Sequence, residues 1–138
     1  MDDVGRRLRD SFARQSMMQT LGAEMVAAEK GRVVIAAPIA DHVLQQQGAA
    51  HAGLAFSIGD SAAGYSALSV MDEGFEVVTV EMKINLLAPA VGERLVAEGR
   101  VIRPGRRIVA VAADVWAESG TGRKHVAALM GTMVPVEP

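Results

Sequence analysis

The longest uncharged stretch of the chain predicts a buried helix. Residues 52–71 carry a single charge, Asp60, and are apolar nearly all the way round a helical projection. A charge near the middle of a membrane span is costly, and this segment also contains several Gly and Ser residues. We therefore interpret residues 51–71 as a helix buried inside protein rather than as a transmembrane segment. Gly74 is expected to end this helix.

Alternating apolar and polar positions predict strands on both sides of this helix. They are expected at residues 23–29, 32–39, 75–87, 93–103, 107–118 and 124–134, with turns at residues 30–31, 104–105 and 119–122. The alternation is clearest near the middle of the chain, where one set of side chains is expected to pack on the helix: Val78, Val80, Met82, Ile84 and Leu86. Residues 107–116 and 125–134 are apolar on both faces, which favours contact with another subunit.

A shorter amphipathic helix is predicted near the N-terminus, over residues 3–20. Val4, Leu8 and Phe12 recur at helical spacing, and Gly22 suits the end of the helix. The arginines of this segment are interpreted as a solvated face. The full order is a helix, two strands, a long helix and a strand meander. This order is typical of an α+β fold, here one domain over residues 1–138, with an antiparallel sheet wrapped around the long helix.

Composition and motifs exclude several function classes. The net charge of −2 argues against a general nucleic-acid binder, and the absence of cysteine excludes disulfides and cysteine nucleophiles. The first residues lack the apolar region of a secretory signal, so a cytoplasmic location is expected. The chain contains no G-x-S-x-G, Walker A or G-x-G-x-x-G motif. His42, His51 and Asp60 match no zinc spacing, so neither a metal nor a cofactor is expected.

Residues 45–60 carry the candidate chemistry. They place a polar loop, then His51, then the first turn of a helix, then a lone carboxylate. Unpaired N–H groups at a helix start can polarise a carbonyl group and hold an oxyanion. Burial raises the pKa of a carboxyl group, which suits Asp60 for activating water or attacking a carbonyl. A hydrogen-bonded helix residue is the alternative interpretation of Asp60, and His51 taken alone is more typical of a structural residue.

This segment resembles the active-site motif of hotdog thioesterases of the phenylacetate-degradation (PaaI-like) type. That motif has an Asn or Gln, then a His followed by glycines, then an acidic residue nine positions after the His. Gln45, His51, Gly53 and Asp60 match it, whereas the family usually has Gly at the position of Ala52. Two later stretches, residues 79–92 and 103–107, resemble the central strand and the following hairpin of the family. The resemblance covers residues 15–134.

The resemblance implies a hotdog fold and hydrolysis of an acyl-CoA to a free acid and CoA. Asp60 would be the general base or nucleophile, and the Ala52 N–H would polarise the thioester carbonyl. Gln45 would orient the substrate or the attacking water, Thr79 would help to place that water, and His51 would shape the helix start. Gly53 matches a position of the substrate-binding motif. The identity of the acyl group stays open.

A tight turn places two further arginines beside Arg103. Arg106 and Arg107 are expected to hold the phosphates of CoA, and a solvated basic hairpin is the alternative interpretation.

Helix geometry predicts that a second copy completes the site. Ala52 and Asp60 are eight residues apart, which is about 12 Å along a helix. One carbonyl cannot touch both groups within one chain, so we expect a homodimer with sites at the subunit boundary. The family implies that such dimers pair into a homotetramer. A non-catalytic acyl-CoA-binding protein and a hotdog hydratase or dehydratase remain as alternative functions, and neither a nucleic-acid nor a membrane partner is expected.

Overall fold

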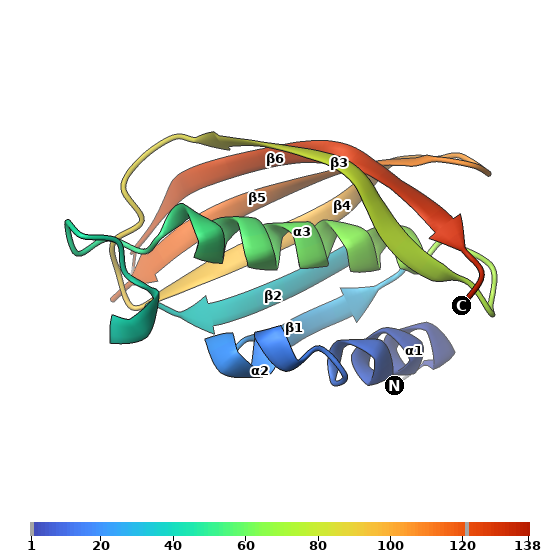
Figure 1. The fold of residues 1–138 in the computed structure, drawn as a ribbon, viewed down its shortest axis with the longest axis horizontal. Helices are drawn as coiled ribbons and strands as arrows, with labels where there is room; N and C mark the ends of the chain where they lie inside the picture. Colours follow the sequence, from blue (N-terminus) through green and yellow to red (C-terminus); the bar gives the residue numbers. More distant parts are fainter. Residues whose placement is uncertain (1, 121) are drawn as a thin grey trace.

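One long helix lies against a curved antiparallel sheet (Figure 1). The computed structural model describes residues 2–120 and 122–138. In this part of the chain the sheet has six strands in the order β1-β2-β4-β5-β6-β3, and all neighbours are antiparallel. The elements are α1 (Asp3–Phe12), α2 (Ser16–Leu21), β1 (Glu24–Glu29), β2 (Arg32–Pro38), η1 (Asp41–Val43), α3 (Ala52–Leu68), β3 (Glu76–Leu86), β4 (Arg94–Pro104), β5 (Val109–Ser119) and β6 (Gly122–Val136). The α+β fold predicted from the sequence is confirmed.

Small residues let α3 pack closely on the sheet. Most of the helix is buried, and Ile58 and Leu68 are fully inaccessible to solvent. Gly99 of β4 faces the backbone of α3 at Ala62 and Ala63, and a β-carbon at Gly99 would overlap those backbone atoms. The position of α3, and with it the position of Asp60, therefore depends on a glycine in the strand beneath. None of the described helices is long and apolar enough to cross a membrane.

Replacing Gly99 by Ala is expected to destabilise the protein by about 1–3 kcal/mol, because the added methyl overpacks the contact between helix and sheet. Gly122→Ala is the matched control, since a β-carbon there meets nothing closer than 4.0 Å. Thermal unfolding of both variants tests the expectation. Equal melting temperatures for the two variants would show that α3 does not depend on Gly99.

The end of α3 differs from the sequence prediction. The helix ends at Leu68 with Ser69 as its C-cap, and Gly74 instead lies in the following loop with a φ of +90°. The Ser69 hydroxyl donates to the Ser66 carbonyl and accepts the Gly31 N–H at 2.7 Å. This side chain therefore ties the helix end to the β1–β2 turn, a contact across 38 residues that local patterns do not reveal.

A β-bulge changes the predicted alternation of β3. The register with β6 shifts between Thr79 and Glu81, which inserts Val80 as an extra residue. Val78 and Val80 consequently lie exposed rather than on α3, whereas Met82 and Ile84 pack against the core as predicted. Leu86 is exposed as well, although it follows the same alternation as Met82 and Ile84, because it is the last residue of the strand. Upstream of the bulge the inward positions are occupied by Val77, which packs on the core, and by Thr79, which meets Asp60. The bulge thus places a hydroxyl group beside the carboxylate.

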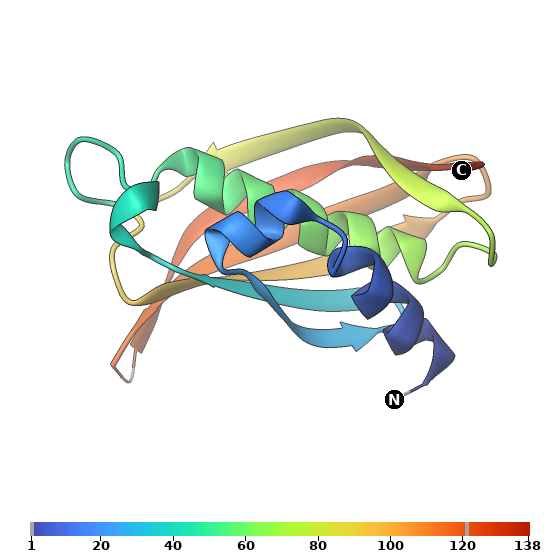
Figure 2. The same cartoon turned by 60° about the horizontal axis from the view of Figure 1, so that its bottom comes forward.

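The predicted N-terminal helix is two helices, α1 and α2, with a break at residues 13–15 (Figure 2). Gly22 ends α2 in the left-handed conformation, as predicted. The arginines are not all solvated: Arg7 donates to the carbonyls of Met71, Asp72 and Phe75, and Arg9 donates to the Met25 carbonyl. Through these bonds α1 is fastened to β1 and to the loop that follows α3.

The outer face of β5 and β6 is more polar than its sequence indicated. Asp114 accepts hydrogen bonds from His125 at 2.9 Å and from Arg100 at 2.7 Å. Trp116 stacks on His125 and lies beneath Arg123. The prediction that both faces of these strands are apolar is therefore wrong over this region, because charged side chains from β4 and β6 gather there.

Candidate active site

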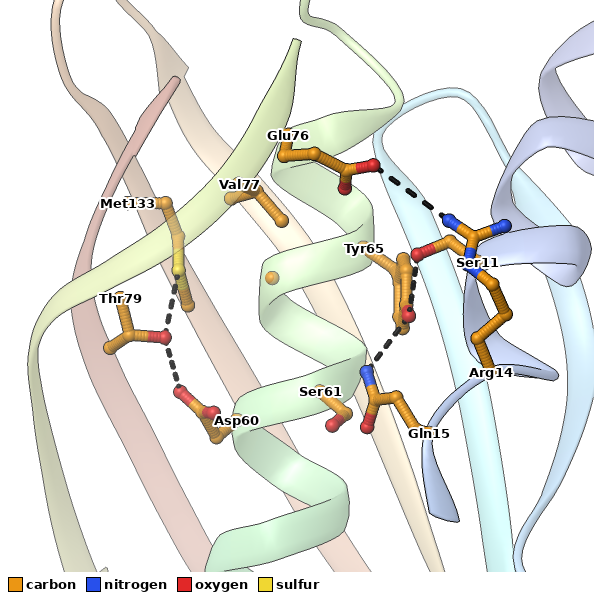
Figure 3. Close-up of a pocket in the computed structure, with 11 residues that line it drawn as sticks. Ser11, Arg14, Gln15, Asp60, Ser61, Tyr65, Glu76, Val77, Thr79 and Met133 are labelled. Carbon is orange, nitrogen blue, oxygen red and sulfur yellow. Dashed lines mark hydrogen bonds and ion pairs between the residues drawn. The ribbon is translucent and has the colours of Figure 1, made fainter. Parts of the chain in front are cut away.

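Asp60 lines a cavity of about 330 Å³ between α3, β3 and the N-terminal helices (Figure 3). Its carboxylate accepts a hydrogen bond from the Thr79 hydroxyl, with 2.8 Å between Oγ1 and Oδ1. No salt bridge reaches the Asp60 carboxylate among the residues that the structure describes. A partly buried carboxylate thus faces an open cavity with one neutral hydrogen-bond partner.

This environment changes the acidity of Asp60. Burial raises the pKa of its carboxyl group above the ordinary value, and the hydrogen bond from Thr79 opposes part of that rise. A carboxylate with a raised pKa is a better proton acceptor than an ordinary aspartate. The site therefore has the electrostatics of a general base or nucleophile.

Replacing Thr79 by Val is expected to move the acidic limb of the pH–activity profile to higher pH. The hydroxyl stabilises the charged form of Asp60, so its loss raises the pKa of the carboxyl further, and less of the carboxylate is ionised at a given acidic pH. A profile of kcat/KM against pH measures the shift. An acidic limb at the wild-type position would show that Thr79 does not control the ionisation of Asp60.

The start of α3 leaves one backbone donor free. His51 is the N-cap residue, and its Nδ1 accepts the Gly53 N–H at 2.8 Å. A β-carbon at Gly53 would come within 3.0 Å of that nitrogen, so glycine keeps room for the imidazole. Among the described residues the Ala52 N–H meets no acceptor. The cap therefore satisfies one helix-start donor and leaves its neighbour available to a ligand.

The side chain of Gln45 makes two hydrogen bonds through its oxygen, and its amide NH₂ meets no acceptor among the described residues. Its side-chain oxygen accepts the N–H groups of Gln47 and Ala49, at 2.5 and 3.2 Å, which closes the loop before α3. Gln45, His51 and Ala52 line one cavity of about 580 Å³. The amide NH₂ of Gln45 remains as the part of the side chain that could orient a substrate or water.

The two halves of the predicted site do not meet within one chain. Gln45, His51 and Ala52 line the larger cavity, whereas Asp60 and Thr79 line the smaller one, and the two cavities share no lining residue. This separation agrees with the helical distance of about 12 Å between Ala52 and Asp60.

Arg106 and Arg107 lie far from the start of α3, in the β4–β5 turn. Both are exposed, and neither forms an ion pair among the described residues. Arg106 lines a separate hollow with Val70 and Met71, just beyond the end of α3. In the described part of the chain, no cluster of three or more His, Asp or Glu side chains is arranged to hold a metal ion.

The cavity of Asp60 contains residues that the sequence did not indicate. Tyr65 lies on the same helix, and its hydroxyl is hydrogen-bonded to Ser11 at 3.0 Å and to Gln15 at 2.8 Å. These contacts join residues 50 or more positions apart. The local signal was a single tyrosine in a largely apolar helix, and such a residue does not identify its partners.

Comparison with known proteins identifies the class defined by this fold and site. Residues 47–123 match the thioesterase superfamily model. A "putative esterase" of Saccharolobus solfataricus is 30% identical over 112 residues, which cover 80% of this chain and 79% of that protein. The match and the helix-over-sheet architecture define a hotdog-fold thioesterase, so the enzyme is a hydrolase. The chain belongs to the thioesterase superfamily.

Solved structures agree with this assignment. A thioesterase family protein from Silicibacter pomeroyi superposes with a TM-score of 0.95 at 38% identity, covering 98% of this chain and 99% of that one. The E. coli PaaI protein from the phenylacetic acid degradation operon superposes with a TM-score of 0.86 at 19% identity, covering 96% and 93% of the two chains. The second comparison shows that this chain shares the fold of PaaI.

Proposed function

We propose that the protein hydrolyses acyl-CoA thioesters, with Asp60 as the catalytic carboxylate. The observation that carries the proposal is a partly buried carboxylate, with a raised pKa, that faces a cavity and is held by Thr79. Such a group can take a proton from water or attack a carbonyl carbon directly. Loss of turnover in a folded Asp60→Asn variant is the principal test.

The reaction uses two groups from opposite ends of one shared site. The Ala52 N–H donates to the thioester oxygen and stabilises the oxyanion that forms when the carbonyl carbon is attacked. In the general-base route, Asp60 takes the proton of the attacking water. Collapse of the tetrahedral intermediate expels the CoA thiolate, which receives a proton. In the nucleophilic route, Asp60 forms an anhydride with the acyl group, and water then cleaves that anhydride.

A second copy of the chain brings the two groups together in this proposal. Two α3 helices running antiparallel about a two-fold axis can place Ala52 of one copy beside Asp60 of the other. The edge strand β3 supports such pairing, since it is 11 residues long and exposes Val78, Val80 and Leu86. The homodimer, its further pairing into a homotetramer and the cytoplasmic location all belong to this proposal.

Arg106 and Arg107 are assigned to the phosphates of CoA. Replacing both by Ala is expected to raise KM and to weaken its dependence on salt, with kcat nearly unchanged, because the lost contact is made equally in the ground and transition states. Steady-state kinetics at low and high salt test this expectation. Arg6→Ala, an exposed change on α1, is the control. An unchanged KM at low salt would mean that the hairpin is merely solvated.

The alternative functions give different results in the same assays. A non-catalytic acyl-CoA-binding protein would bind the thioester without releasing thiol, and Asp60→Asn would leave its binding unchanged. A hydratase or dehydratase would alter the acyl chain and leave the thioester intact. Release of free CoA thiol from a panel of acyl-CoAs separates all three.

A further inference from the structure

The cavity beside Asp60 is closed at its far end by hydrogen-bonding side chains. Tyr65 Oη accepts the Gln15 amide N–H and shares a hydrogen bond with the Ser11 hydroxyl (Figure 3). We call Ser11, Gln15 and Tyr65 the polar wall. It exists because the chain breaks between α1 and α2 at residues 13–15, which turns Gln15 toward α3.

The lining of the cavity changes along its length. Asp60, Thr79 and Met133 lie at one end and the polar wall lies at the other; between them are Val77, Ser61 and Gly64, the last without a side chain. Asp60 and Tyr65 are five residues apart on α3, a rise of about 7.5 Å. A guest that reaches both ends therefore needs an apolar body and a polar tip.

The polar wall is electrically neutral. Burial raises the pKa of the Tyr65 hydroxyl, so it keeps its proton at ordinary pH. Among the described residues that line the cavity, the one cation is Arg14; its guanidinium lies 3.8 Å from the Glu76 carboxylate, which offsets its charge. In the described part of the chain, no hydrogen bond reaches the side-chain oxygen Oε1 of Gln15 or the hydroxyl of Ser61, and both residues line this cavity. These groups suit a neutral hydroxyl better than a carboxylate or a plain hydrocarbon end.

From this geometry we infer that the polar wall selects the acyl group: the enzyme takes short acyl chains that end in a neutral hydroxyl. The inference rests on the proposed function in one respect, that the thioester carbonyl lies at Asp60. The acyl group, rather than CoA, then occupies this cavity, because Arg106 and Arg107 lie outside it. The volume of about 330 Å³ is at the small end for ligand sites, which favours short acyl groups over long fatty chains.

A six-carbon chain with a terminal hydroxyl matches the rise of about 7.5 Å along α3 between Asp60 and Tyr65. An extended chain advances about 1.2 Å per bond, so the six bonds from the carbonyl carbon to the hydroxyl oxygen of ω-hydroxyhexanoyl-CoA span about 7 Å. Hexanoyl-CoA lacks only the hydroxyl group, and adipoyl-CoA replaces the tip by a carboxylate. The three thioesters differ only at the end of the acyl chain, so comparing their affinities tests which end group the polar wall prefers.

Binding is measured by calorimetry on the Asp60→Asn variant, which is expected to turn over at least about 10²-fold more slowly, and kcat/KM is measured on the wild type. We expect ω-hydroxyhexanoyl-CoA to bind about three- to tenfold tighter than hexanoyl-CoA, which is the effect of one hydrogen bond, and tighter than adipoyl-CoA. Gln15→Leu and Tyr65→Phe should each bring the ratio of the affinities for ω-hydroxyhexanoyl-CoA and hexanoyl-CoA closer to one. Gln19→Leu, on the exposed side of α2, should preserve it and so control for the glutamine change.

The two proposals fail in different ways. Tighter binding of the hydroxylated thioester without thiol release by the wild type would contradict the proposed function and leave the polar wall intact. Turnover with equal affinity for the hydroxylated and plain thioesters would contradict the inference that the polar wall selects the acyl group. A preference for the hydroxylated thioester that survives Gln15→Leu would contradict it as well. If neither thioester binds, the inference about the polar wall is also wrong.

Discussion

Asp60→Asn is expected to lower kcat by at least about 10²–10⁴-fold, the usual contribution of general-base catalysis, while the protein stays folded. Asn is nearly isosteric and can still accept the hydrogen bond from Thr79. It cannot take a proton from water or attack as an anion. Thiol release measured on folded protein tests this result, with Asp41→Asn, an exposed change in η1, as the matched control.

Asp60→Asn is also expected to affect the stability of the fold. Because burial raises the pKa of Asp60, the folded protein holds that proton more tightly than the unfolded chain does. The ionised side chain therefore lowers the free energy of unfolding as pH rises above the pKa of the unfolded state. Asn carries no charge, so the melting temperature at neutral pH should equal or exceed that of the wild type. A folded variant with wild-type kcat would show that Asp60 is a structural residue.

Ala52→Pro is expected to lower kcat by about 10²–10³-fold, the usual effect of removing one oxyanion donor. Proline lacks the N–H that α3 leaves free at this position. The fold should tolerate it, because Ala52 is the first helical residue, where proline is favoured. His51 already has the extended conformation that a following proline requires, with φ −60° and ψ 142°.

A matched change at the same position separates the N–H from the side chain. Ala52→Gly keeps the donor and should retain most of the activity. Steady-state kinetics and thermal unfolding of both variants show whether the loss of activity comes from the missing N–H or from a disturbed fold. Wild-type turnover by a folded Ala52→Pro protein would show that this N–H does not polarise the carbonyl.

Local sequence patterns predicted the elements well because their signals are local. The uncharged run around Asp60 identified the buried helix, and strand alternation with turn residues identified all six strands to within a few residues. The errors occurred where distant residues decide the structure. Gly74 was a reasonable helix stop by type, but α3 ends earlier, where Ser69 binds the β1–β2 turn.

The bulge in β3 shows why side-chain direction was harder to predict than the strand itself. Strict alternation assigned Val78 and Val80 to the core, but Val80 is itself the inserted residue and the insertion reverses the direction of Val78, so both are exposed. A bulge depends on the match between two strands, here β3 and β6, which lie far apart in the sequence. The same insertion directs Thr79 toward Asp60, so the side-chain directions of β3 were predicted wrongly next to the candidate site.

The candidate site itself was only partly readable from the sequence. The spacing from Gln45 to Asp60 carried the resemblance to the thioesterase family, and the family model matches residues 47–123, which include Asp60 but not Gln45. The polar wall had no such signal, because Gln15 and Ser11 reach Tyr65 only through the break between α1 and α2. Long-range contacts of this kind depend on tertiary packing.

Mixed dimers of two inactive variants test the central claim most directly. If Ala52 of one copy works with Asp60 of the other, a dimer of one Asp60→Asn chain and one Ala52→Pro chain contains one intact site and one site with both defects. Co-expression with two affinity tags, followed by sequential purification, isolates assemblies that contain both chains and are therefore enriched in such dimers. We expect the mixed dimer to recover up to about half of the wild-type thiol release, although the Asp60→Asn and Ala52→Pro homodimers are each nearly inactive. Activity no higher than that of the parents, in a folded mixed dimer, would contradict a site shared between two copies.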